Sequence, residues 1–356
     1  MTAPQPRPAP PIGVPAPDRP RTVALDVMGG DHAPGVALRA AAAISRETDI
    51  ALLLVGDAKR LEGELARHGA DSSRIAWIHA TDAIGMGDAP REAATRSASS
   101  LALAADAVAA GRADALVSAG NTGALLLHAA RAIPRLPGVR RAALAAVYPT
   151  LPRPHNPDPF ALLLDVGANL QCSAADLLQF AAMGTAYAAR ISKVPRPSVG
   201  LLNIGEEAGK GDSLLREAHA ALAAAPGIAF HGNVEGRAVP LGAVDVVVCP
   251  GVMGNVVLKL LESMGEVLVA MGDAVYRERL RWRAGRFLLR DGLARVSNLL
   301  DYASYGGAPI LGFERIVIKA HGRSGDRALE NAIKVAAKAV RDDVCGAIAA
   351  ELRGLS

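Results

Sequence analysis

The stretch Thr22-Val23-Ala24-Leu25-Asp26-Val27-Met28-Gly29-Gly30-Asp31-His32 joins an apolar, β-branched run to a glycine-rich loop, and an alanine-rich segment follows it. A run, a loop and a helix in this order form the repeating unit of a buried parallel sheet. Three further segments repeat the pattern: Val117-Ser118-Ala119-Gly120-Asn121-Thr122-Gly123, Leu164-Asp165-Val166-Gly167-Ala168-Asn169 and Val248-Cys249-Pro250-Gly251-Val252-Met253-Gly254-Asn255. The repetition predicts an α/β fold with a mostly parallel sheet.

Local patterns place the elements of this fold. Short apolar runs predict strands at residues 22–27, 51–55, 74–79, 114–118, 142–147, 161–166, 199–204, 244–249 and 316–319. One helix should be capped by Asp88, carry Pro90 in its first turn and run through residue 110, where Gly111 ends it. Ser173 and Asp176 have the spacing of a capping box that begins a helix over residues 177–191.

The composition describes a folded chain without a strong charge. Of 356 residues 51% are hydrophobic and 21% charged, and the net charge of +4 is too small to indicate nucleic-acid binding. Cys172, Cys249 and Cys345 form no CxxC pair, so a disulfide framework or zinc cluster is not expected and a reducing cytoplasm suits the chain. We see no signal peptide and no run of about 20 apolar residues. Closely spaced prolines predict a disordered tail over residues 1–20.

Each glycine-rich junction follows a predicted strand, and the carboxyl ends of parallel strands lie at one edge of a sheet. Glycine lets the backbone approach a ligand, asparagine tolerates left-handed geometry, and the N–H groups that begin a helix attract anions. The junctions are therefore either ordinary strand-to-helix turns or the walls of one phosphate-binding crevice.

Signatures of other chemistry are missing. The segment Gly30–Gly35 has the gap of a Walker A loop, but Val36 and Ala37 stand where Lys and Ser or Thr are needed. No GxGxxG follows the first strand, and no GxSxG or HExxH is present. We therefore expect a small anion, with no metal and no cofactor. Among the histidines, His32, His231 and His321 adjoin glycine-bearing segments and are candidates for a site.

A further glycine-rich segment precedes the last strand: Tyr305-Gly306-Gly307-Ala308-Pro309-Ile310-Leu311-Gly312 leads into Ile316-Val317-Ile318-Lys319-Ala320-His321-Gly322. Together with the junctions, Asn203-Ile204-Gly205-Glu206-Glu207 and Gly232-Asn233-Val234-Glu235-Gly236, this succession resembles the PlsX family of phosphate acyltransferases over residues 21–341. The resemblance implies a three-layer α/β/α fold similar to isocitrate dehydrogenases and phosphotransacetylases. It implies transfer of a long-chain acyl group from acyl carrier protein to inorganic phosphate, which gives acyl phosphate for glycerol-3-phosphate acylation.

This reaction suits a chain without a catalytic serine or cysteine, because phosphate is itself the nucleophile. We expect Lys319, His321 and Asn255 to be catalytic, with Lys319 neutralising phosphate or the oxyanion and His321 holding phosphate or protonating the thiolate. The residues expected to bind phosphate or the thioester are Gly30, Asp31, His32, Asn121, Thr122, Asp165, Gly167, Asn169, Lys210 and Asn233. Asn121, Asn169, Asn233 and Asn255 would donate amide N–H groups. A structural alternative pairs Lys319 and His321 with Glu206 and Glu207.

The chain departs from the family pattern in three places. Pro250 and Met253 replace an aspartate and a threonine, the basic cluster before Ser99 is thinned to Arg96, and Arg323-Ser324 stands where Ser-Ser is typical. These departures leave two alternatives open: a catalytically weakened scaffold that binds acyl carrier protein at the membrane, and an acyltransferase that uses acyl-coenzyme A.

Residues 256–302 interrupt the alternation of strands and helices. Two apolar stripes at helical spacing, 257–275 and 289–300, predict a protruding helical hairpin. Arginines and aromatic residues lie between the stripes, and the expected contacts to a membrane or carrier are Arg277, Arg281, Trp282, Arg283, Phe287 and Leu288. The pattern fits a membrane surface, an acidic carrier, a dimer interface or a solvated arm.

The resemblance decides among these readings. It favours a homodimer attached peripherally to the inner face of the cell membrane, with a downstream glycerol-3-phosphate acyltransferase as a further partner. Residues 342–356 are expected to form a C-terminal helix end or a tail.

Overall fold

The structure is a computed structural model that describes residues 20–151, 159–300 and 306–355. The chain forms two compact units, Met1–Pro137 with Gly312–Ala350, and Gly138–Leu311 with Glu351–Ser356. The proline-rich segment predicted to be a tail lies, apart from Pro20, outside the described residues.

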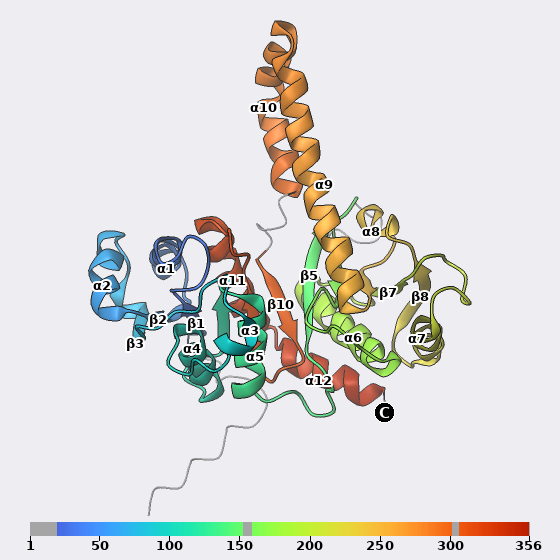
Figure 1. The fold of residues 1–356 in the computed structure, drawn as a ribbon, viewed down its shortest axis with the longest axis horizontal. Coiled ribbons are helices and arrows are strands. Elements are labelled where there is room, and N and C mark those ends of the chain that lie inside the picture. Colours follow the sequence, from blue (N-terminus) through green and yellow to red (C-terminus); the bar gives the residue numbers. More distant parts are fainter. Residues whose placement is uncertain (1–19, 152–158, 301–305, 356) are drawn as a thin grey trace, which may run out of the picture. The chain divides into compact units, whose positions relative to one another are not determined.

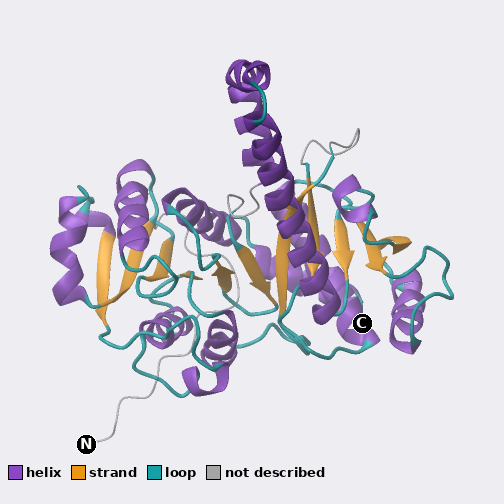
Figure 2. Cartoon of the chain, turned by 45° about the horizontal axis from the view of Figure 1, so that its top comes forward, coloured by secondary structure: helices purple, strands orange, loops and turns teal. Residues whose placement is uncertain are grey.

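The first unit contains a parallel sheet with helices on both faces. Its strands lie in the order β3 (Ile75–His79), β2 (Ala51–Gly56), β1 (Thr22–Asp26), β4 (Ala115–Ser118) and β11 (Ile316–Lys319). One face carries α1 (Gly35–Glu47), α2 (Ala58–Arg67) and α11 (Asp326–Arg341), and the other carries α4 (Ser100–Ala109) and α5 (Thr122–Ala132), as Figure 2 shows. A short turn, η1 (Ser72–Arg74), precedes β3. Because both faces are covered, the central strands are almost continuously apolar.

The second unit contains a mixed sheet. Its strands lie in the order β10 (Ala308–Leu311), β5 (Ala143–Pro149), β6 (Phe160–Leu164), β9 (Val246–Val248), β7 (Ser198–Leu202) and β8 (Ala229–Val234). β5 runs antiparallel to β10 and β6, and the other pairs are parallel. Its shorter helices are α6 (Ala174–Tyr187) with the π-helix η2 (Ala188–Ser192), α7 (Ser213–Ala224) and α8 (Ala238–Leu241). The predicted α/β class with a mostly parallel sheet is confirmed.

Two strands are not predicted by the sequence pattern, and each has a physical reason. β8 lies at the edge of its sheet and carries a polar, partly exposed sequence, so it lacks the apolar run of a buried strand. β10 follows two glycines and contains Pro309, which reads as a loop.

The helix predicted over residues 90–110 is wrong as a single element. α3 (Pro90–Ala93) begins after Ala89, which offers no side-chain cap, and α4 begins after Ser99, whose Oγ accepts from the N–H of Ala102 at 3.3 Å. A second serine-capped start is the reason for the break. The capping box at Ser173 and Asp176 is confirmed, and it begins α6 at Ala174.

The predicted hairpin is formed by α9 (Gly251–Arg277) and α10 (Leu280–Leu300), which lie side by side and project from the second unit (Figure 1). At 27 residues α9 is about 40 Å long. It starts five residues earlier than the predicted Val256, directly after β9. The final helix is α12 (Val344–Gly354). No helix in the described part of the chain is long and apolar enough to cross a membrane.

Candidate functional site

Three neighbouring strands of the first unit end in polar residues that stand in one row. Asp26 at the end of β1 lies opposite Ser118 of β4, and Ser118 lies opposite Lys319 of β11. Because side chains alternate along a strand, residues in register face the same side of the sheet. All three are buried, and Lys319 is only 7% exposed. We call this carboxylate, hydroxyl and ammonium group the Asp26–Lys319 row.

The Asp26 carboxylate accepts hydrogen bonds from several elements. Ser118 Oγ donates to Oδ2 at 2.7 Å, and Ser100 Oγ, at the start of α4, donates to Oδ1 at 2.6 Å. The N–H of Met28 also donates to Oδ1, at 3.3 Å. Burial raises the pKa of Asp26, while these donors and the charge of Lys319 oppose the rise. The network joins β1, β4 and α4 beneath the loops that follow the strands.

Three of those loops pack backbone to backbone. A Cβ at Gly29 would lie 2.4 Å from Asp26 Oδ2 and 2.8 Å from the nitrogen of Gly120. Gly30 has φ +108°, and the next N–H, that of Asp31, donates to the carbonyl of Gly322 at 2.9 Å. The loops after β1 (residues 27–34), β4 (119–121) and β11 (320–325) therefore contact one another, and only glycine allows the approach at position 29.

The predicted side chains on these loops differ in exposure. Lys319 Nζ donates to the carbonyl of Ala119 at 3.3 Å and to that of Ala320, so its charge lies against the β4 and β11 loops. His321 is half-buried, and its Nδ1 accepts from the N–H of Arg323 at 3.2 Å. Asp31 and His32 are exposed. The lysine lies at the base of the loops and the imidazole nearer their surface.

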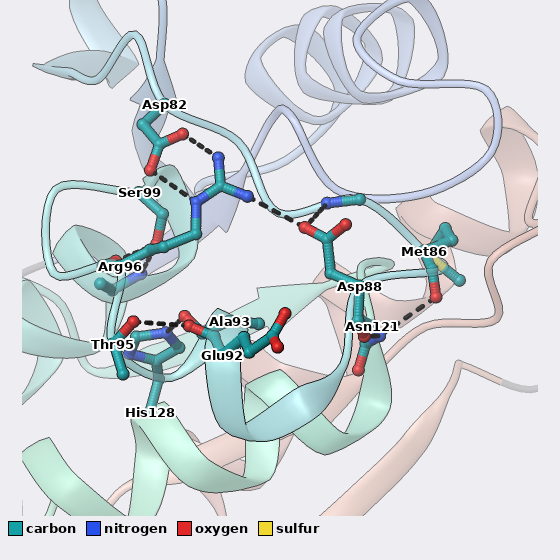
Figure 3. A network of polar contacts seen from close by, with 12 residues as sticks. Asp82, Met86, Asp88, Glu92, Ala93, Thr95, Arg96, Ser99, Asn121 and His128 are labelled. Carbon is teal, nitrogen blue, oxygen red and sulfur yellow. Dashed lines mark hydrogen bonds and ion pairs between the residues drawn. The ribbon is translucent and has the colours of Figure 1, made fainter.

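Asn121 connects the β4 loop to a long segment that crosses it. Its Oδ1 caps α5 by accepting from the N–H of Ala124 at 3.0 Å, and its Nδ2 donates to the carbonyls of Met86 at 3.1 Å and Asp88 at 2.9 Å. Figure 3 shows this contact with residues 81–99, which we call the 81–99 loop. The amide that the sequence assigned to substrate is thus used to position this loop, and Thr122 begins α5 beside it.

Arg96 fastens the 81–99 loop to itself. Its Nε donates to Asp82 Oδ2 at 3.0 Å, its Nη1 donates to Asp88 Oδ2 at 2.9 Å, and its Nη2 also pairs with Asp82 (Figure 3). Pro90 in the same loop lies directly over α5, because a Cβ at Gly123 would approach it to 2.6 Å. Arg96, the one arginine left from the basic cluster, therefore fixes the 81–99 loop, which packs on α5.

The second unit has its own buried carboxylate at a strand end. Asp165, directly after β6, is fully buried and accepts from four main-chain N–H groups, including those of Gly167 at 3.2 Å and Asn169 at 2.8 Å. The Asn169 side chain donates to Asp165 Oδ2 at 3.0 Å and to the carbonyl of Ala142 at 2.9 Å. Asp165 and Asn169 thus shape the loop that the sequence assigned to substrate binding.

Helix α9 begins against this loop. A Cβ at Gly251 would lie 2.5 Å from Asp165 Oδ2, and one at Gly254 would lie 2.0 Å from the Asp165 carbonyl oxygen. Asn255, one turn into the helix, is exposed, and its Oδ1 would lie 3.5 Å from a Cβ at Gly167. The structure therefore places the candidate Asn255 beside the Gly167 loop.

The loop between β7 and α7 is held by two asparagines. Asn203 Nδ2 donates to the carbonyl of Lys210 at 3.1 Å, and Asn233 Nδ2 donates to that of Glu207 at 2.8 Å. The Asn233 oxygen lies 3.0 Å from His219 Nδ1. Asn233 therefore holds the loop from which the exposed Lys210 extends, and sequence reasoning had not assigned it this role.

The acidic pair in this loop has partners of its own. Lys210 Nζ lies 3.8 Å from Glu207 Oε2, and Arg237 Nη2 lies 3.6 Å from Glu206 Oε1. These exposed pairs contribute little to stability. Both pairs lie within the second unit.

The predicted site residues thus form two groups, one in each unit. The first contains Gly30, Asp31, His32, Asn121, Thr122, Lys319 and His321, and the second contains Asp165, Gly167, Asn169, Lys210, Asn233 and Asn255. Sequence reasoning missed Asp26, Ser100 and Ser118, although a polar residue at the end of an apolar strand was a visible signal for two of them.

The cysteines are poor nucleophiles. Burial raises the pKa of the half-buried Cys172 to about 11 and that of Cys345 to about 12, and it also raises the pKa of the fully buried Cys249. Since the thiolate is the reactive form, these thiols are inert near neutral pH. Among the residues that the structure describes, no cluster of His, Cys, Asp and Glu could hold a metal ion.

The hairpin exposes apolar and cationic side chains together. Leu280 and Leu288 are 80% and 81% exposed, and Arg281 lies 5.8 Å from the ring centre of Trp282. Between the helices is a cavity of about 660 Å³ lined by Tyr276, Arg277, Arg283, Arg286, Phe287 and Arg290. Anionic groups and apolar surface are the two chemistries that this region can bind.

Comparisons with known proteins match nearly the whole chain, including the glycine-rich loops of both units. A model of the family described as "Fatty acid synthesis protein" matches residues 21–347. The phosphate acyltransferase of Geobacter sulfurreducens is 42% identical over 325 residues, covering 90% of this chain and 91% of the relative. That of Moorella thermoacetica is 42% identical over 327 residues, covering 92% and 94%.

Solved structures show the same fold at low identity. A phosphotransacetylase from Streptococcus pyogenes aligns with a TM-score of 0.62 and 17% identity, over 90% of this chain and 94% of that one. A branched-chain phosphotransacylase from Enterococcus faecalis V583 aligns with a TM-score of 0.53 and 16% identity, over 90% and 99%.

Proposed function

The chain belongs to the family of phosphate acyltransferases of fatty acid and phospholipid synthesis, and from this premise we propose that it transfers a long-chain acyl group from acyl carrier protein to inorganic phosphate. It is an acyltransferase; the donor, the acceptor and the residues that act are what we propose. The observation that supports them best is the Asp26–Lys319 row, a buried ammonium group beneath three loops of glycine backbone.

The reaction needs orientation and charge more than a protein nucleophile. A phosphate oxygen attacks the thioester carbonyl carbon and gives a tetrahedral oxyanion; the C–S bond then breaks, and the thiolate leaves and takes a proton. A positioned cation and main-chain N–H groups stabilise such an oxyanion, and one well-placed donor contributes about 3 kcal/mol. The raised thiol pKa of Cys172 and Cys249 argues against an acyl-cysteine intermediate.

We assign roles on this basis. Lys319 attracts phosphate to the loops of the first unit, and His321, on the same loop and nearer the surface, gives a proton to the thiolate. In the second unit, Asn255 of α9 lies beside the Gly167 loop that Asp165 holds, and Lys210 extends from the loop that Asn233 holds. The exposed amide of Asn255 suits a carbonyl oxygen, and the exposed ammonium group of Lys210 suits an anion.

Mass spectrometry of the carrier protein tests the reaction directly. Purified chain, long-chain acyl-carrier protein and phosphate should give free carrier thiol, and omission of phosphate should stop its formation. Carrier binding without phosphate-dependent turnover would favour the scaffold, and a preference for acyl-coenzyme A would favour the other acyltransferase.

Matched lysine variants test the site. Lys319→Met and Lys210→Met should each lower kcat/KM at least about a hundredfold, the scale of one lost oxyanion contact. Lys334→Met is the control, because Lys334 is a partly exposed residue of α11 that pairs with Glu330 at 3.9 Å. Wild-type turnover in Lys319→Met or Lys210→Met would remove that lysine from the site.

We also propose that the hairpin attaches the enzyme to the inner face of the cell membrane. The support is the combination of exposed leucines, Phe287 and a cluster of arginines on one projecting element. Arginines near an anionic surface contribute about 1 kcal/mol each. Such attachment would leave an apolar product next to the bilayer.

Vesicle sedimentation tests this attachment. The double variant Arg281→Glu, Arg283→Glu should lose most binding to vesicles that contain anionic lipid. The matched control, Arg60→Glu with Arg67→Glu, reverses two exposed charges on α2 and should bind like wild type. Equal binding by both double variants would contradict the assignment.

Homodimerisation is the remaining part of the proposal, and sedimentation equilibrium would give the mass of the assembly directly.

A further inference from the structure

The Asp26–Lys319 row contains two charges that are nearly removed from water. Asp26 is 3% exposed and Lys319 is 7% exposed, and they stand on either side of Ser118, two strand spacings or about 10 Å apart at Cα. A buried charge is costly unless another charge and hydrogen bonds compensate it. The protonation states of the two groups are therefore linked.

The hydrogen bonds suit an ionised carboxylate and an ammonium group. The recorded partners of Asp26, namely Ser118 Oγ, Ser100 Oγ and the Met28 N–H, all donate to it, as they would to an ionised carboxylate. Lys319 Nζ donates to two carbonyl oxygens, those of Ala119 and Ala320, as an ammonium group does. Ser118 also accepts from the N–H of Gly120 at 3.0 Å, so donors run from the β4 loop toward Asp26.

We propose that Asp26 is a positioning residue that keeps Lys319 protonated beneath the glycine loops, so that phosphate meets a cation there at neutral and alkaline pH. The inference rests on the proposed function, because it takes Lys319 as the phosphate-binding group. Asp26 itself lies below the loops, with Gly29 and Gly120 packed over its Oδ2, so it acts through Lys319.

Other charged and polar groups lie on the elements around the row. The β1 loop carries Asp31 and His32, which are exposed, and the β11 loop carries His321. The α4 and β4 elements present hydroxyl groups, Ser100 and Ser118, to the carboxylate. A shift of the alkaline limb that appears only when Asp26 loses its charge therefore reports on the Asp26–Lys319 pair.

A double-mutant cycle tests the inference. The proteins are wild type, Asp26→Asn, Lys319→Met and the double variant, and the measurement is KM for phosphate and kcat from pH 6 to 10. Asparagine keeps the shape of the side chain and removes its charge. Asp26→Asn should move the alkaline rise in KM at least about one pH unit lower, which corresponds to a tenfold larger acid dissociation constant of Lys319. In the Lys319→Met background it should add little further effect.

The outcomes separate the inference from the proposed function. No acyl transfer by wild type would contradict the proposed function, and the same cycle in urea unfolding would then still decide whether the two charges are coupled. With active wild type, identical alkaline limbs, or effects that add across the cycle, would overturn the positioning role.

If Asp26→Asn does not fold, Ser100→Ala serves as the second variant. It removes one donor from the carboxylate, which weakens its ionised form, and should shift the alkaline limb in the same direction by a smaller amount. An unchanged limb in Ser100→Ala, with Lys319→Met impaired, would overturn the inference.

Discussion

Two substitutions of Asn121 should separate the stability that comes from capping α5 from the stability that comes from holding the 81–99 loop. Its side chain makes three hydrogen bonds, one to the N–H of Ala124 in α5 and two to carbonyls of Met86 and Asp88. Asn121→Ala removes all three. Asn121→Ser keeps a capping hydroxyl for the Ala124 N–H but is too short to reach the loop.

The expected magnitudes follow from these contacts. Loss of an N-cap costs about 1 kcal/mol, and a neutral hydrogen bond contributes about 0.5–1.5 kcal/mol. Met86 is exposed and Asp88 half-exposed, so water can replace the two amide donors and the lower value applies to each. We expect the free energy of unfolding of the first unit to fall by about 2 kcal/mol in Asn121→Ala and by about 1 kcal/mol in Asn121→Ser.

Tryptophan fluorescence can follow the first unit alone. The chain has two tryptophans, Trp77 in β3 and Trp282 in the hairpin, so in a Trp282→Phe background the signal reports on Trp77. Urea unfolding of the two Asn121 variants in this background gives the two free energies. Equal values for serine and alanine would show that the cap contributes nothing, and values equal to the parent would refute the account of the 81–99 loop.

Two further predictions concern the second unit. Gly251→Ala should destabilise it strongly, because the new Cβ would lie 2.3 Å from the carbonyl oxygen of Asn169 and 2.5 Å from Asp165 Oδ2. Gly265→Ala, in the same helix with open space around it, should stabilise α9 by about 1 kcal/mol. A higher melting temperature for Gly251→Ala than for Gly265→Ala would contradict this account of the packing. Cys172, with its pKa raised from 9.0 to about 11, should react with iodoacetamide about a hundredfold more slowly at pH 7 than a thiol of ordinary pKa and speed up until pH 11; a plateau reached near pH 9 would contradict the burial argument.

The two units use one device in different ways. In each, a buried aspartate at a strand end organises the loop that follows, and a glycine elsewhere in the unit packs against the carboxylate. Asp165 is satisfied mainly by main-chain N–H groups, which makes it a loop-shaping residue. Asp26 is satisfied mainly by two serine hydroxyls and has a lysine within its electrostatic reach. Because of this difference, Asp26 can stabilise the charge of Lys319, whereas Asp165 fixes the backbone of its loop.

The sequence by itself determined the α/β class, most strands, the Ser173 capping box, the hairpin and the family. These depend on hydrophobic periodicity, capping residues and ordered motifs, all of which are local in the chain. The same local reasoning failed where the signal was weak, at the polar edge strand β8, and where two helix starts competed, at Pro90 and Ser99.

Only the tertiary structure decided what the polar residues do. Asp26, Ser118 and Lys319 lie 92 and 201 positions apart in sequence, and only strand order and register place them in one row. The asparagines show the same dependence, because an amide near a glycine loop looks identical in sequence whether it faces a ligand or a carbonyl of a distant segment. Asn121 faces Met86 and Asp88, 35 and 33 residues away, and that choice was made by packing.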